Sequence, residues 1–233
     1  MKWTQKRFWK AATVAPAEGG FTVHLDQRQV KTPGKSLLVV PTDAMARAIA
    51  AEWEAQQGPV RPETMPYTRA ANSALEKVAP QFDEVVALLA AYGDSDLLCY
   101  RAPGPQELTL LQAKAWDPLL DWAAQTLNAP LTVTTGVVHT PQPDPSTKRL
   151  HELTAAHTHF QTAAFHDLVS LSGSLILAFA VTHGRLSPDE AWAISRIDET
   201  YQISLWGEDD EAAALAESKR LAFHQAARFW AVC

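Results

Sequence analysis

The hydrophobic period of the chain changes at Thr42. Before it, apolar and polar residues alternate over residues 21–26, which is the period of a half-buried strand. After it, Met45, Ile49 and Trp53 recur every four residues, as they would on one face of a helix. The sequence therefore predicts an α+β protein, with a small β-rich N-terminal module followed by a larger all-helical domain.

Glycines and prolines divide the N-terminal module into short pieces. We expect a strand at 21–25, a return arm at 29–32 and a third short strand at 37–40 that Pro41 ends. Several prolines between residues 59 and 66 then keep a second helix from starting at once. We place the domain boundary there, with residues 1–62 as the β-rich module with one helix and residues 63–233 as the helical domain. A β-branched segment at 132–138 is a possible strand returning to the first module.

Several helix starts can be recognised from capping residues. Thr42 is a suitable N-cap, and Ser187-Pro-Asp-Glu190 has the pattern of a capping box with proline at the first helical position. Asp117-Pro118 suggests a further start, and Asp209 or Asp210 caps a final helix that runs to the C-terminus.

The region from Leu150 to His183 reads as one long helix, or as two helices broken near Gly173. Its second half is apolar all round, which is typical of a helix at the centre of a bundle. Ser172 and Ser174 lie inside this helical pattern, and small side chains there let helices approach closely.

Composition narrows the range of partners. The formal net charge is −6, with a sequence pI near 5.7, which disfavours nucleic acid because binding phosphates needs a basic surface. The longest apolar run, residues 175–181, is too short to cross a bilayer. Two cysteines, Cys99 and Cys233, cannot build a disulfide framework. The first ten residues lack the apolar core of a secretory signal, so we expect a cytoplasmic protein.

The sequence contains no convincing catalytic or metal-binding motif. His151, His157, His159 and His166 are separated by six, two and seven residues, which does not place ligands on one helical face. Lys35-Ser36 lacks the upstream glycine of a phosphate-binding loop, and no GxSxG surrounds Ser172 or Ser174. We therefore expect no metal, no cofactor and no enzymatic activity.

Two other interpretations stay open. One is an enzyme of unknown type that uses the Asp94 and Asp96 or the Asp198 and Glu199 carboxylates in an interdomain cleft. The other is a structural subunit with a large permanent apolar interface.

Nine segments carry a family likeness in register over nearly the whole chain. They are Lys6-Arg-Phe-Trp-Lys10, Val30-Lys-Thr-Pro33, Pro41-Thr42, Ala51-Glu-Trp53 with Ala55-Gln56, Met65-Pro66 with Thr68-Arg69, Asp96-Leu-Leu-Cys-Tyr-Arg101, Trp116-Asp-Pro-Leu-Leu-Asp-Trp122, Gly173-Ser174 and Trp206-Gly207. Together they resemble the ATP synthase F-one sector assembly chaperones that bind the α subunit. The resemblance implies two domains and a monomeric chaperone that holds the unassembled α subunit until the β subunit displaces it.

The resemblance also implies a region for partner binding. In this family the acidic stretch near the C-terminal helices contacts the partner. That stretch matches Asp198, Glu199 and Trp206 through Glu211 here, including Gly207. Glu211 is the first choice, because Asp209 or Asp210 already serves as the helix cap. Trp53 is a further candidate, since tryptophan suits protein interfaces as well as cores.

The chain departs from the family pattern at the first hairpin. The family has Asp-Gly at the turn, and this chain has Asp26-Gln27. Because a type I′ turn would need a positive φ at Gln27, we expect a longer or bulged turn. The family's eukaryotic members carry a mitochondrial import extension. This chain begins close to its first motif, which favours a bacterial cytoplasmic form.

Overall fold

The computed structural model describes residues 6–233, which form two compact units. The first contains the chain up to Phe82, together with His159–Ala164 and Arg228–Cys233. The second contains Asp83–Thr158 and Phe165–Ala227. The first unit thus extends past the expected boundary at residue 62, because the helix that follows this boundary packs against the first helix of the same unit.

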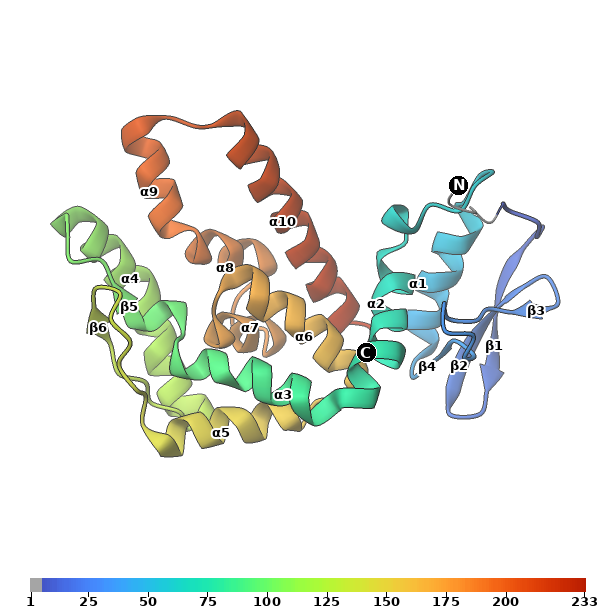
Figure 1. The fold of residues 1–233 in the computed structure, drawn as a ribbon, viewed down its shortest axis with the longest axis horizontal. Coiled ribbons are helices and arrows are strands. Elements are labelled where there is room, and N and C mark those ends of the chain that lie inside the picture. The colour runs from blue at the N-terminus through green and yellow to red at the C-terminus, as the bar shows by residue number, and fades with distance from the viewer. Residues whose placement is uncertain (1–5) are drawn as a thin grey trace. The chain divides into compact units, whose positions relative to one another are not determined.

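The first unit contains a small sheet followed by helices (Figure 1, blue to green). Its elements are β1 (Ala12–Ala17), β2 (Gly20–Leu25), β3 (Arg28–Gln29), β4 (Val39–Val40), α1 (Asp43–Glu54), η1 (Pro62–Thr64), α2 (Pro66–Ser73), η2 (Ala74–Val78) and η3 (Ala79–Gln81). Strand β2 is central, with β1 antiparallel on one side and with β3 and β4 on the other. The predicted strands correspond to β2, β3 and β4, whereas β1 was not anticipated.

The turn between β2 and β3 differs from the expectation. Leu25 pairs directly with Arg28, so the turn has two residues and is not lengthened or bulged. The positive φ falls on Asp26, at 56°, instead of on Gln27. Asp26 tolerates this conformation because its carboxylate accepts hydrogen bonds from the backbone N–H groups of Lys10 and Ala11.

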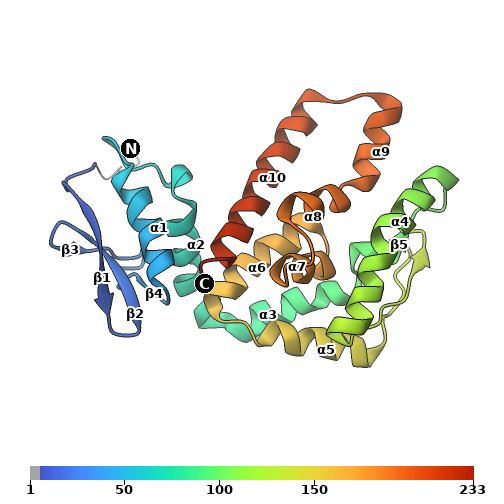
Figure 2. The same cartoon turned by 180° about the vertical axis from the view of Figure 1, so that it is seen from behind.

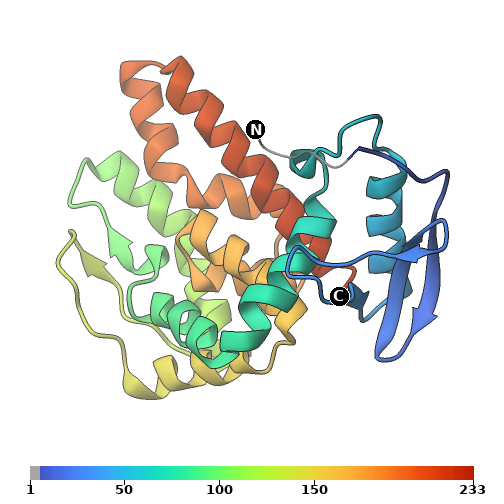
Figure 3. The same cartoon turned by 45° about the vertical axis from the view of Figure 1, so that its right-hand side comes forward.

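Helix α1 covers one face of the sheet (Figure 3). Val23 and Leu25 of the sheet and Met45 and Ile49 of α1 are all buried in the core between them. Each such side chain contributes roughly 2 kcal/mol by leaving water. The Thr42 hydroxyl accepts a hydrogen bond from the Met45 N–H at 3.1 Å, so the predicted N-cap is confirmed.

The second unit is almost entirely helical. Its elements are α3 (Phe82–Ala90), η4 (Ala91–Asp94), η5 (Leu97–Cys99), β5 (Tyr100–Arg101), α4 (Gln106–Trp122), η6 (Ala123–Leu127), β6 (Thr134–Thr135), α5 (Asp144–Ala155), α6 (His159–Ser172), α7 (Leu175–Thr182), α8 (Pro188–Ser195), α9 (Ile197–Trp206) and α10 (Asp210–Trp230), of which α3 and α6 begin and α10 ends in the first unit. With a small N-terminal sheet and a mostly helical remainder, the chain has the predicted α+β fold class.

Helix α7 lies at the centre of the second unit, as its apolar sequence predicts. Leu175 through Ala180 are buried all round the helix. The expected break near Gly173 is present, where φ is +73°. Ser174 is not inside a helix, however. Its hydroxyl caps α7 by accepting the Leu177 N–H at 3.0 Å.

Three further expectations about the helical region need correction. Residues 150–183 form parts of three helices, with a second break between Ala155 and His159. Pro118 lies inside α4 and does not start a helix there. The strand expected at 132–138 is short. Its residues, Thr134 and Thr135, pair in parallel with β5 of the second unit instead of returning to the first sheet.

Candidate partner-binding site

Helix α9 is held in place by two buried side chains of α4. The Gln112 amide donates to Oδ1 of Asp198 at 2.6 Å, and the Trp116 indole N–H donates to the Ile194 carbonyl at 3.1 Å, just before α9. Gln112 also accepts the Ala102 N–H through its own carbonyl. Since a buried amide needs both its donor and its acceptor satisfied, this bond fixes Asp198 as part of the scaffold.

Glu199 is used inside the fold as well. Its Oε1 lies 3.0 Å from an Arg196 guanidinium nitrogen, and the same guanidinium lies over the Trp192 ring. Both partners are partly exposed, so the ion pair contributes only a few tenths of a kcal/mol. Asp198 and Glu199 therefore help to position α9, and one carboxylate oxygen of each is already engaged within the protein.

The end of α9 and the start of α10 lie differently. Every residue from Gln202 to Ala212 is exposed, and we call this segment the hairpin tip. The segment projects beyond the other helices of its unit (Figures 1 and 2). Gly207 ends α9 with φ +87°, a conformation that suits glycine. Asp209 caps α10 by accepting the Ala212 N–H at 2.8 Å, so the predicted cap falls on Asp209.

The hairpin tip exposes large apolar side chains. Trp206 is 78% exposed, Leu205 is 56% exposed and Ile203 is also exposed. Leu215, on α10 just beyond the tip, is exposed as well. Such side chains gain free energy when they leave water, so this cluster favours contact with another apolar surface.

The tip and the adjoining parts of α9 and α10 have charge of a single sign. Residues 197–218 include no lysine, arginine or histidine. Their acidic residues are Asp198, Glu199, Glu208, Asp209, Asp210, Glu211 and Glu217. In the described part of the chain Glu211 makes no hydrogen bond or ion pair, which leaves its carboxylate available to a partner.

Three of the predicted site residues, Trp206, Gly207 and Glu211, thus share one exposed segment. Sequence reasoning missed the apolar residues Ile203, Leu205 and Leu215. The signal that could have found them is the long interval without a basic residue, because an ordinary solvated helix mixes both signs of charge.

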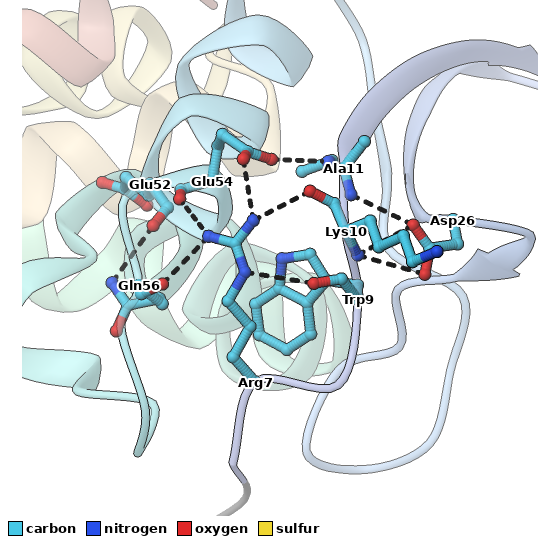
Figure 4. A network of polar contacts seen from close by, with 9 residues as sticks. Arg7, Trp9, Lys10, Ala11, Asp26, Glu52, Glu54 and Gln56 are labelled. Atoms are coloured by element: carbon cyan, nitrogen blue, oxygen red, sulfur yellow. Dashed lines mark hydrogen bonds and ion pairs between the residues drawn. The ribbon is translucent and has the colours of Figure 1, made fainter.

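Trp53 lies in the first unit and has a packing role. Its ring is part of the N-terminal core, with its centroid 5.3 Å from that of Trp9 in an edge-on contact. Figure 4 shows Arg7 beside Trp9, where the guanidinium donates to the Trp9 carbonyl and pairs with Glu54 at 2.8 Å. The first family motif therefore ties the N-terminal segment to the end of α1.

The carboxylates of the enzyme alternative are engaged in structure. Asp96 is completely buried and accepts hydrogen bonds from the Leu98 N–H, the Ile176 N–H and the Ser174 hydroxyl. Burial raises the pKa of Asp96 to about 6, although these hydrogen bonds oppose the shift. Oδ2 of Asp94 lies 3.2 Å from Nε2 of His139, and Oδ1 of Asp94 accepts the Gln142 N–H. Both residues hold segments of the second unit together.

The histidines considered as ligands are dispersed. His157 stacks edge-on with Phe165, and burial lowers its pKa to about 4, whereas His166 pairs with Asp167 at 3.0 Å. Between residues 6 and 233, His, Cys, Asp and Glu nowhere form a group of three that could hold a metal ion. Nor does this part of the chain contain a helix long and apolar enough to span a bilayer.

Comparison with known proteins gives consistent matches. The model of the ATP12 chaperone protein family matches residues 6–124, just over half of the chain. The mitochondrial protein atp12 of Schizosaccharomyces pombe is 27% identical over 219 residues, which covers 89% of this chain and 75% of that protein.

Two crystal structures match nearly the whole fold. Atp12 from Paracoccus denitrificans is 50% identical, with a TM-score of 0.96 and 97% of each chain covered. A structure from Agrobacterium tumefaciens is 39% identical, with a TM-score of 0.92, covering 97% of this chain and 85% of that one. The resemblance found in the sequence motifs is therefore confirmed, and the chain belongs to the ATP12 chaperone protein family.

Proposed function

We propose that this chain binds the unassembled α subunit of ATP synthase and holds it until the β subunit takes its place. Membership of the ATP12 chaperone family supports a role in ATP synthase assembly. The observation that carries the proposal is the hairpin tip, where apolar side chains are exposed among carboxylates. A subunit awaiting assembly exposes an apolar interface, and shielding this interface prevents aggregation.

The two properties of the tip suit two steps of binding. Its acidic residues speed encounter with a basic surface and select against acidic ones. Its apolar side chains, Trp206 above all, supply the affinity once water is excluded. The tip is small, so the complex is weak enough for the true partner subunit to displace the chaperone.

This function needs no chemical turnover, so we propose a binding protein without enzymatic activity. We also propose that the chain acts as a monomer in the bacterial cytoplasm. The origin of the two similar crystal structures, P. denitrificans and A. tumefaciens, supports the cellular setting.

The test is co-purification of this protein with isolated ATP synthase α subunit, with and without the β subunit. We expect a complex with α that β disrupts. The variants W206A and E211K should weaken the complex at least tenfold, because central interface residues contribute about 2 kcal/mol. Leu88 and Glu84 on α3 are also exposed, so L88A and E84K are matched controls. A stable complex of all three proteins, or equal loss in the controls, contradicts the proposal.

A further inference from the structure

Strand β1 lies at the free edge of the N-terminal sheet. Within the described residues it pairs with β2 alone, from Ala12 opposite Leu25 to Ala17 opposite Gly20. An edge strand presents unpaired backbone groups that can pair with another chain. The register between β1 and β2 determines which of these groups are accessible.

The register shows which backbone groups face away from β2. The Val23 carbonyl accepts the Val30 N–H, so the polar groups of Val23 face β3. Its partner Val14 is then in a non-hydrogen-bonded pair, with its N–H and carbonyl directed outward. By alternation, those of Ala12 and Pro16 are directed outward too.

Two of these three outward positions cannot donate to a new strand. The Ala12 N–H already donates to Oε2 of Glu54 at 2.8 Å, and Pro16 has no N–H. In the described part of the molecule the Val14 N–H meets no acceptor. The edge therefore offers one donor at Val14, flanked by carbonyl oxygens, which limits the number of backbone hydrogen bonds that an added strand can form.

A groove of about 590 Å³ runs along this edge. Its lining residues are Ala12, Thr13, Val14, Pro16 and Phe21 of the sheet and Asp43, Arg47 and Ala50 of α1. Its volume is in the range of known ligand sites, roughly 300–1,000 Å³. The groove thus combines the free strand edge with an apolar floor and one charged wall.

Arg47 and Asp43 supply charges of opposite sign on that wall and form an ion pair. The Arg47 Nε donates to Oδ2 of Asp43 at 2.5 Å, and the Arg47 side chain is 71% exposed. For residues 6–233 no partner is seen for its two terminal nitrogens, which form a fork that matches a carboxylate. Helix α1 begins shortly after Val40, which pairs with Phe21 opposite Pro16, and it ends where Glu54 contacts Ala12, so it runs antiparallel to β1. Arg47 lies roughly 10 Å along α1 from Glu54. That position falls between Val14 and Pro16, roughly 7 and 13 Å along β1.

We infer that this groove binds an extended segment of another polypeptide as an additional strand beside β1. The segment pairs with the backbone of Val14, places apolar side chains on Val14 and Phe21, and directs an acidic side chain to the fork of Arg47. Because few backbone hydrogen bonds can form, this contact is weak and reversible. It lies in a different unit from the hairpin tip and does not depend on the tip for its chemistry.

The test uses a fluorescein-labelled peptide, Thr-Val-Thr-Glu-Thr-Val-Thr, and the full chain. We expect saturable binding by fluorescence anisotropy and a downfield NMR shift of the Val14 amide proton as it gains an acceptor. A peptide with lysine in place of glutamate should bind about tenfold less tightly, since it loses a charge-assisted hydrogen bond.

Variants separate the backbone contact from the charge. R47Q should remove the preference for glutamate over lysine, whereas R61Q, at an exposed arginine of the same unit, should leave it intact. V14P removes the single free donor and should weaken binding about threefold to tenfold. P16V adds an outward N–H at the edge and should tighten binding by a similar factor, so the inference does not rely on the folding of V14P.

Several outcomes would overturn the inference. A Val14 amide that does not shift at saturating peptide excludes strand addition. Equal binding of the glutamate and lysine peptides excludes the role of Arg47. Sedimentation that detects a dimer abolished by V14P would mean that a second copy of this chain occupies the edge. E211K should leave binding of this peptide unchanged, so a failure of this inference can be told apart from a failure of the proposal for the hairpin tip.

Discussion

Acidic residues serve opposite purposes in two regions of this molecule. Around α7 the Asp96 carboxylate is fully buried and accepts three hydrogen bonds from its own unit. At the hairpin tip, Glu211 is exposed, and within the described residues its carboxylate makes no hydrogen bond or ion pair. The first carboxylate organises a helix terminus, and the second is available to another molecule.

The difference shows that residue type alone does not reveal a binding site. Glu52 is mostly buried like Asp96 and accepts the N–H groups of Tyr67 and Thr68 at the start of α2. Burial raises the pKa of Glu52, against the opposing effect of those hydrogen bonds. A carboxylate that accepts hydrogen bonds within the protein stabilises the fold. A carboxylate without such bonds can form them with a binding partner and so contribute to the free energy of binding.

The largest expected effect is loss of the buried carboxylate. D96A leaves the Leu98 and Ile176 N–H groups and the Ser174 hydroxyl without an acceptor in a dry environment. We expect a loss of roughly 3–5 kcal/mol in the free energy of unfolding, measured by urea denaturation. E211A is the matched carboxylate removal at the tip. Comparable losses in both variants would contradict the distinction.

The pH dependence of stability gives the next largest effect. The pKa of Asp96 is near 3.8 in the unfolded chain and about 6 in the folded one, so the folded state holds the proton more tightly. Its contribution is fully present below about pH 4 and is lost as the pH rises through 6, on the order of 3 kcal/mol in all.

This window is tested by measuring unfolding of the wild type and of D96N between pH 4 and 7. Asn cannot titrate, so the difference between the two curves isolates Asp96. Glu54 and Glu190 have lowered pKa values because of hydrogen bonds from Arg7 and from Ser187, and their effects have the opposite sign. Because both proteins contain Glu54 and Glu190, the effects of these two residues cancel in the difference between the curves. Parallel curves would show that Asp96 does not titrate in this range.

Glu190 is an intermediate case. It is exposed, like the residues of the hairpin tip, but its carboxylate accepts hydrogen bonds within the protein, as that of Asp96 does. It completes the capping box by accepting the Ser187 N–H at 2.8 Å, while the Ser187 hydroxyl accepts the Glu190 N–H. S187A should cost about 1 kcal/mol in thermal or urea unfolding, with no change in α-subunit binding. A binding defect in S187A would mean that the tip depends on the start of α8.

The smallest contrast lies within the tip itself. D209A removes the N-cap of α10 and should cost about 1 kcal/mol, whereas E211A should change stability by less than about 0.5 kcal/mol. Binding to the α subunit should show the opposite order, with E211A binding more weakly than D209A. Equal effects on stability would assign Glu211 a structural role.

Local signals in the sequence predicted local structure well. The Thr42 cap, the Ser187 capping box and the apolar helix α7 depend on residues close to one another in the chain, and all three are confirmed. The same local reasoning misplaced Asp117-Pro118, because a proline tolerated inside α4 has the same sequence signature as one at a helix start.

The candidate site was predicted only in part for a similar reason. Trp206, Gly207 and Glu211 were found because they follow a family motif and a helix cap. Asp198 is an acidic residue like Glu211, but its carboxylate accepts a hydrogen bond from Gln112, which is distant in sequence. Trp53 has the same chemistry as Trp206, but it packs on Trp9.

The sequence by itself determined the fold class, the helix caps and the family, since each depends on periodicity or on motifs read along the chain. The tertiary structure decided which acids and aromatics are exposed, and it revealed β1 as an edge strand with one free donor at Val14. Exposure and strand pairing arise from contacts between residues far apart in sequence. A pattern along the chain therefore cannot encode them directly.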